Sequence, residues 1–130
     1  MKPIITLSSV LITVAGVYAQ EATLEQIIKG RDDLLTKIHE TMKKSFDAGV
    51  ASEEDVYRAI LELYSFRRDT SKALAERLQW QEQIVTSEKQ RKAVVEKRLK
   101  QGTTTPVDGL RASERLLAAE QKLLELKSEK

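Results

Sequence analysis

The 130-residue sequence has no cysteine, only two prolines and few aromatic residues. Without cysteine the chain forms no disulfide and carries no lipid-bearing cysteine of the kind found in bacterial lipoproteins. Small exported domains of eukaryotes usually contain disulfides, so for an exported chain this absence favours a bacterial envelope. A charged fraction of 32% with 5% aromatics argues against a large globular core.

Strand patterns are also missing, because no alternating β-branched run follows Ala19. The long segments are instead rich in Ala, Leu, Glu, Lys, Arg and Gln, which lose little entropy on becoming helical. The sequence therefore predicts an all-α protein of long helical hairpins.

The segment 1–19 has the features of a signal peptide. Lys2 precedes an apolar run over 3–17, and Val17 and Ala19 place small residues before a cleavage site. An uncleaved N-terminal anchor is the alternative, because the run is close to the shortest length that spans a bilayer. In both cases we expect residues 20–130 to lie outside the cytoplasm, in the periplasm or cell envelope of a Gram-negative-type bacterium. Loss of Lys2 lowers the formal net charge of +2 by one, so bulk charge favours neither a nucleic-acid partner nor an anionic membrane. After cleavage we also expect no segment that spans the membrane.

Apolar residues spaced three and four apart predict a first helix over 23–46, ending near Gly49. Ser52 and the three acids after it predict the start of a second helix. No glycine or proline interrupts 52–101, which predicts one continuous rod of about 75 Å. The alternative is a break at Ser87, where Gln90 could complete a capping box, giving a four-helix bundle. Thr105 and Pro106 predict the start of the last helix.

The two turns are copies of one motif, and the copies span 38–63 and 91–116. Capping rules explain Gly, Ser or Thr, and Asp, but they do not explain the Arg-Ala pair that recurs one turn later, so we interpret the motif as a duplication. The motif residues, which we expect to dock a partner, are Gly49, Ser52, Asp55 and Arg58 in the first copy and, at matching places in the second, Gly102, Thr105, Asp108 and Arg111.

The segment from Phe46 to Ala59 resembles the helix-turn-helix tip of the TolC-type outer-membrane efflux protein family. That tip has an aromatic residue or Leu, then Gly, Ser or Thr, Asp, Val or Leu, and Ala at fixed intervals. The copy from Leu99 to Ala112 keeps most of the pattern but has Gly109 where Val is usual. The resemblance covers about 38–124 and implies docking at the periplasmic end of a helical barrel, where an adaptor subunit binds in that family.

Two features depart from the family. Its members contain barrel-forming strands and run to several hundred residues, whereas this chain has no such strands and cannot form a channel alone. In addition, the two family tips lie at one end, whereas a continuous helix over 52–101 would place Gly49 and Gly102 at opposite ends. Short tandem relatives of the tip therefore fit better than an efflux duct.

Candidates for chemistry are few, and we expect no enzyme, cofactor or metal site. His39 is the only histidine, and we expect it on a solvated face. The acids at 53–55 have an electrostatic reason to begin a helix. The basic pairs at 67–68 and 91–92 are expected to be solvated, with Glu88 paired to Lys92. Trp80 is expected at a helix–helix contact rather than as a ligand platform.

The function that these features favour is a non-enzymatic envelope interaction protein that docks helices of itself or of a partner through its glycine-centred turns. We expect it to form oligomers, because two helices in cross-section bury little apolar surface. The alternative is a periplasmic helical chaperone or scaffold that clamps apolar segments.

Overall fold

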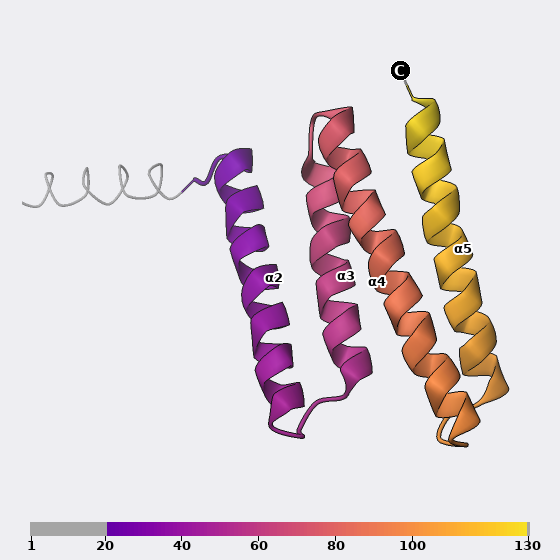
Figure 1. Cartoon of the computed structure of the whole chain (residues 1–130). Helices are drawn as coiled ribbons and strands as arrows, with labels where there is room; N and C mark the ends of the chain where they lie inside the picture. The colour runs from indigo at the N-terminus through magenta and orange to yellow at the C-terminus, as the bar shows by residue number, and fades with distance from the viewer. Residues whose placement is uncertain (1–20, 130) are drawn as a thin grey trace, which may run out of the picture. The chain divides into compact units, whose positions relative to one another are not determined.

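A computed structural model describes residues 21–129, so the expected signal peptide and its cleavage after Ala19 lie outside the described residues. The described chain forms four helices and no strand: α2 (Leu24–Asp47), α3 (Glu53–Thr70), α4 (Leu74–Lys100) and α5 (Pro106–Ser128) (Figure 1). The predicted all-α class is confirmed. Across 21–129, no helix has the length and apolar character needed to cross a bilayer.

Contacts divide the chain into two compact units, with the boundary after Arg31 inside α2. The described part of the first unit, 21–31, contains the start of that helix. The hydroxyl of Thr23 accepts a hydrogen bond from the backbone amide of Gln26 at 3.2 Å. The side-chain oxygen of Gln26 accepts one from the backbone amide of Thr23 at 2.9 Å. This reciprocal capping box fixes where α2 begins, close to the predicted position.

The second unit, 32–129, holds the rest of the fold, and here the expected continuous central helix is wrong. The chain leaves the helix after Thr70, passes Ser71 in an extended conformation and starts α4 at Leu74. The alternative break near Ser87 is also wrong in position, because Ser87 lies inside α4. A four-helix arrangement therefore arises through a turn at 71–73.

Side chains around 71–73 satisfy the backbone groups that this break releases. The hydroxyls of Thr70 and Ser71 donate to the carbonyls of Phe66 and Arg67 at 2.9 and 2.6 Å. The Arg77 guanidinium then donates to the carbonyl of Lys72 at 3.0 Å. Such local hydrogen bonds compete with helix continuation, so no glycine or proline is needed to end α3.

The core of the second unit lies where α3 and α5 pack against the long α4. Its centre is Ile84, Val85 and Ala119, against which side chains of α3 and α5 pack. On α5 the inward residues recur at intervals of four and three, as in a coiled coil: these are Ala112, Leu116, Ala119, Leu123 and Leu126. By contrast, α2 contributes no buried residue.

The polar stretch after Leu78 contributes to this core. Gln81 is only 1% exposed. The side-chain nitrogen of Gln81 donates to the Ala119 carbonyl of α5 at 2.8 Å, and its side-chain oxygen accepts a hydrogen bond from the Arg68 guanidinium of α3 at 2.6 Å. Because both of its polar atoms are paired, Gln81 stabilises the middle of α4 instead of breaking it.

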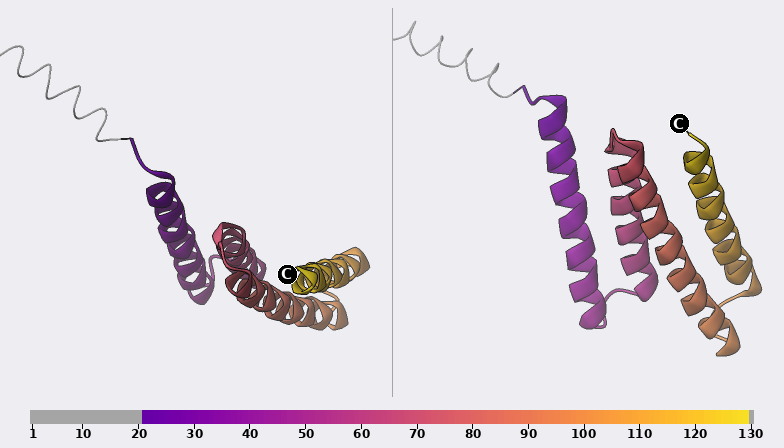
Figure 2. Two further views of the ribbon diagram at one scale, coloured as in Figure 1. Left: turned by 90° about the horizontal axis from the view of Figure 1, so that it is seen from above. Right: turned by 45° about the horizontal axis from the view of Figure 1, so that its top comes forward.

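The chain reverses direction at 71–73, which makes α3 and α4 antiparallel. It reverses again at 101–105, which makes α4 and α5 antiparallel. The turns at 48–52 and 101–105 therefore lie at the same end of the second unit, and 71–73 lies at the other (Figures 1 and 2). The expected separation of Gly49 and Gly102 to opposite ends is wrong. Both turns lie at one end, so the placement of the turns no longer differs from that of the efflux-protein tips.

Candidate functional site: the two turns

The first turn, 48–52, ends α2 through a left-handed glycine. Gly49 has φ of 77°, and its amide donates to the Phe46 carbonyl at 2.9 Å. The Val50 amide donates to the Ser45 carbonyl at 2.8 Å. These two bonds form a Schellman motif, which needs a residue at positive φ and so favours glycine.

The second turn, 101–105, repeats these two hydrogen bonds. Gly102 has φ of 72° and donates to the Leu99 carbonyl at 3.1 Å, while Thr103 donates to the Arg98 carbonyl at 2.9 Å. Every donor and acceptor occupies the same place in its copy of the motif as its counterpart in the first turn. The predicted copies therefore share backbone hydrogen bonds as well as sequence.

Each turn leads into a capping box. The Asp55 amide donates to the Ser52 hydroxyl at 3.1 Å, and the Ser52 amide donates to the Asp55 carboxylate at 3.1 Å. The corresponding bonds between Thr105 and Asp108 measure 3.3 and 3.4 Å. The predicted roles of these four residues as helix caps are confirmed.

Hydrogen bonding to the charged form also sets the acidity of the two capping carboxylates. The pKa of Asp55 is lowered mainly by the Ser52 backbone amide and then by its hydroxyl. The pKa of Asp108 is lowered by the hydroxyl of Thr104, then by the hydroxyl and amide of Thr105. Both caps are therefore ionised at neutral pH and face the positive ends of α3 and α5.

Gly109, which departs from the tip pattern, lies close to the side chain of Leu99. A Cβ at this position would lie 2.6 Å from the Cδ1 of Leu99, closer than carbon atoms pack. In the first copy the equivalent place is taken by Val56, which is half-buried. The glycine allows the start of α5 to approach the end of α4 closely.

Arg58 and Arg111, which occupy equivalent positions in the two copies, line one cavity of about 330 Å³. We call it the arginine pocket. Helices α3, α4 and α5 each contribute to its lining, which consists of Glu54, Arg58, Arg91, Val95, Arg98, Thr104, Asp108, Arg111 and Arg115. Of the eight predicted site residues, the structure brings Arg58, Asp108 and Arg111 together here, while Gly49, Ser52 and Asp55 stay at the first turn and Gly102 and Thr105 at the second.

Sequence reasoning missed the ion pairs that join the helices around this pocket. Arg91 Nε donates to Glu54 Oε2 at 3.1 Å, its Nη2 also bonds Glu54 Oε1, and Nη1 donates to Glu88 Oε1 at 3.2 Å. The expectation that Arg91 is solvated is wrong, since its side chain is 12% exposed. The expected pairing of Glu88 with Lys92 is also wrong, because Lys92 pairs with Glu96.

The contact with Arg91 holds Glu54 ionised. The hydrogen bond from Arg91 lowers the pKa of Glu54, against the opposing effect of burial. Burial alone would lower the pKa of Arg91, but its hydrogen bonds and proximity to Glu54 and Glu88 raise it overall. The only signal in the sequence was the i, i+3 spacing of Glu88 and Arg91, which does not identify Glu54 as the third member.

Trp80 lies at a helix contact, as predicted. Its ring centroid is 5.5 Å from that of Tyr64 on α3, and the Arg67 guanidinium lies 5.1 Å from the Trp80 ring centroid. The solvated state expected for Arg67 is therefore wrong. A depression of about 600 Å³ beside these rings is larger than the arginine pocket, but among the described residues of its lining only Glu82 is charged.

His39 is partly buried on α2, and burial followed by repulsion from Lys43 lowers its pKa. Among residues 21–129, no three His, Cys, Asp or Glu side chains are grouped as ligands for a metal ion. Of the acids that begin α3, Asp55 caps the helix and Glu54 pairs with Arg91.

Comparison with known proteins gives no match, either to a family model, to a curated protein or to a solved structure.

Proposed function

We propose that this chain is a non-enzymatic helical interaction protein of the cell envelope, which docks partner helices through its two glycine-centred turns. The observation that carries the proposal is that the two duplicated turns lie at the same end of the second unit with the same backbone geometry. A pair of equivalent ends facing one way can meet one partner surface. The resemblance of both turns to the tips of TolC-type efflux proteins supports this use.

Exposed apolar residues at the turns support docking further. Val50 in the first turn is 84% exposed, and Val107 and Leu110 at the start of α5 are also exposed. Polar residues usually occupy such turns, so apolar side chains there favour contact with another protein.

The outer face of α5 supports association along the helices as well as at the turns. Leu110, Leu117 and Leu124 recur at a heptad spacing and are 71%, 65% and 67% exposed. A heptad spacing keeps one face of a helix against a partner helix in a coiled coil. In the second unit, Leu34 and Ile38 of α2 are likewise exposed. We propose that these faces are covered by further copies of the chain or by helices of a partner.

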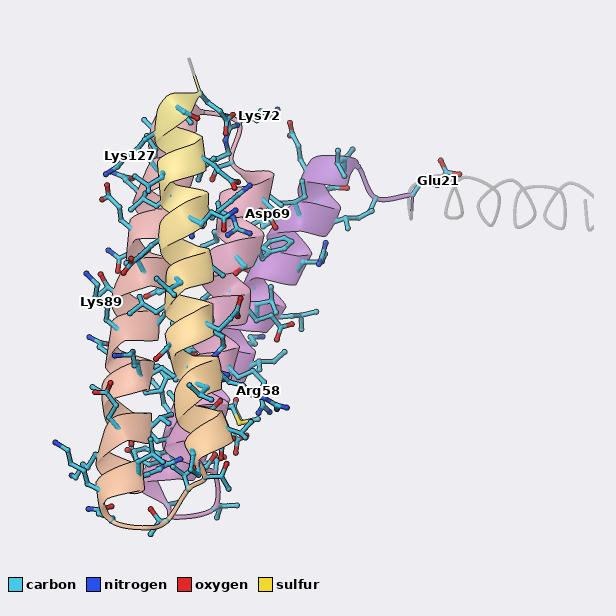
Figure 3. All side chains as sticks on the ribbon, turned by 90° about the vertical axis from the view of Figure 1, so that its right-hand side faces the viewer. Glu21, Arg58, Asp69, Lys72, Lys89 and Lys127 are labelled. Carbon is cyan, nitrogen blue, oxygen red and sulfur yellow. The ribbon has the colours of Figure 1, made fainter. Side chains whose placement is uncertain are left out.

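Photo-crosslinking in cells tests the turns. A photoreactive amino acid at Val50 or Thr103 should give adducts of discrete mass, whereas the same residue at Lys72, at the opposite end (Figure 3), should not. Equal or stronger adducts at Lys72 would contradict docking through the turns. A broad smear of adducts with many proteins, together with suppression of aggregation of an unfolded substrate, would favour the alternative chaperone function.

Light scattering and circular dichroism on the mature protein test self-association. We expect a mass above that of the monomer and a helix content that falls on dilution. Leu117→Glu combined with Leu124→Glu should lower the mass, whereas Lys127→Glu on the same helix should not. A wild-type monomer whose helicity is independent of concentration would leave only a foreign partner to cover α5.

Export is the remaining part of the proposal, and it rests on Lys2, the apolar run and Ala19. Mass spectrometry of the envelope fraction should find Gln20 at the N-terminus. Full-length protein confined to the cytosol would contradict an envelope function.

A further inference from the structure

The arginine pocket combines charge from both copies of the motif in one place. Arg58 reaches it from the second turn of α3, and Arg111 reaches it from the matching position in α5. On α4, Arg91 and Arg98 stand one heptad apart and both line it. Neither capping nor core packing requires an arginine at 58 or 111, because the caps are complete without them.

The acids near the pocket are already engaged. Glu54 accepts two hydrogen bonds from Arg91, and Glu88 accepts one from the same guanidinium. Asp108 Oδ2 accepts from the hydroxyls of Thr104 and Thr105 at 2.6 and 3.0 Å. One of their oxygens, Glu88 Oε2, is buried without a hydrogen bond.

Several guanidinium donors at the pocket remain available. Within residues 21–129, neither Arg98 nor Arg111 forms an ion pair within 4.0 Å. The Nε of Arg115 is buried without a hydrogen bond and forms an ion pair with Glu88 Oε2 at 3.6 Å. The guanidinium donors of Arg98 and Arg111 are therefore available to a ligand.

Among the residues that line the pocket, positive charge is in excess. The lining has five arginines and two carboxylates. Glu88, beside Arg91 and Arg115, and Asp55, 3.5 Å from Arg58, add two carboxylates from outside the lining. The N-termini of α3 and α5 add their positive dipole ends at the same place.

We propose that the arginine pocket binds a small anion that carries two or more carboxylate or phosphate groups. Guanidinium groups offer paired N–H donors that match the oxygens of both groups, and donors from three helices converge here. A volume of about 330 Å³ suits a small ligand. Among residues 21–129, Val95 is the single apolar residue of the lining, so the pocket selects charge rather than an apolar body. Because a bound anion would join α3, α4 and α5, it would stabilise the turn end of the protein.

Isothermal titration calorimetry on the mature protein tests this directly and needs no docking partner. Citrate and pyrophosphate are the probes for carboxylate and phosphate, with potassium chloride at matched ionic strength as the reference. We expect saturable binding of at least one probe, and a rise in Tm with its concentration. Tighter binding of citrate would assign carboxylate ligands, and tighter binding of pyrophosphate would assign phosphate ligands.

Variants separate the pocket from bulk charge. Arg58→Gln and Arg111→Gln should each weaken binding about tenfold, through loss of a charge-assisted pair. Arg77→Gln removes the same charge at the opposite end, where Arg77 lies 3.5 Å from Glu129, and should leave the Kd unchanged. Circular dichroism verifies that each variant stays helical. No saturable heat with either probe, or an equal loss in Arg77→Gln, would overturn the proposal.

Discussion

Arg67 of α3 holds Asp32 of α2 in a two-pronged ion pair. Its Nε donates to Asp32 Oδ2 at 2.8 Å, and its Nη2 donates to Asp32 Oδ1 at 3.0 Å. The same guanidinium lies over the Trp80 ring of α4. This side chain therefore links three helices, and hydrogen bonding to Asp32 raises the pKa of Arg67 despite partial burial.

A double-mutant cycle with Arg67→Ala and Asp32→Ala should show coupling. We expect about 1 kcal/mol, because the pair has good geometry but keeps some solvent contact. The exposed pair Arg58 and Asp55, 3.5 Å apart within α3, is the control and should couple less. Urea unfolding of the four proteins in each cycle provides the measurement. Equal coupling in both cycles would show that the ion pair to α2 contributes no more than a surface contact.

Gly102→Val should destabilise the protein by about 1–3 kcal/mol, because a β-branched residue is strained at positive φ. Nothing lies within 4 Å of the Cβ that would be added, so the loss comes from the backbone alone. Gly30→Val is the matched control, since Gly30 is helical and equally unobstructed, and it should be neutral or slightly stabilising. An unchanged denaturation midpoint for Gly102→Val would contradict a left-handed backbone conformation at residue 102.

Ala73→Asp tests the position of the helix break. Ala73 is the N-cap of α4 and supplies no side-chain hydrogen bond. An aspartate there should stabilise the protein by about 1 kcal/mol, the usual worth of an N-cap. In a continuous helix it would instead be an unfavourable interior residue, as Ala93→Asp within α4 should be. The sign of the change in Tm decides between the two structures.

Acid should lower the free energy of unfolding by protonating the two capping carboxylates, Asp55 and Asp108. The pKa values of Asp55 and Asp108 are lowered in the folded chain. Their stabilisation is therefore present above the unfolded value of about 3.9 and is lost as the pH falls through the lower folded values. Asn at both positions keeps a capping oxygen but does not titrate, so this variant should lose less stability between pH 5 and 3.

Glu82→Gln, which removes an exposed carboxylate in α4, is the control for the acid experiment. Its unfolding free energy should follow pH as the wild type does. If the variant with both caps changed to Asn follows the wild-type curve too, the caps do not cause the acid sensitivity.

The sequence by itself determined the helical class and the two turns. A cap depends on residues that are close neighbours along the chain, so Gly49, Ser52 and Asp55, and their counterparts in the second turn, already specify the hydrogen bonds seen in the structure. The start of the last helix at Pro106 was predictable for the same reason.

Only the tertiary structure decided where the central helix breaks and which polar residues are buried. Hydroxyls at 70 and 71 permit a turn, but the packing of α3 on α4 that follows from it depends on distant partners. Gln81 meets Ala119 across 38 residues of sequence, Arg91 meets Glu54 across 37, and Arg67 meets Asp32 across 35. Helical periodicity says which residues share a face, but it does not say which helix covers that face. Folding back at 71–73 makes that choice, and it brings the two turns, with their matching arginines, to one end.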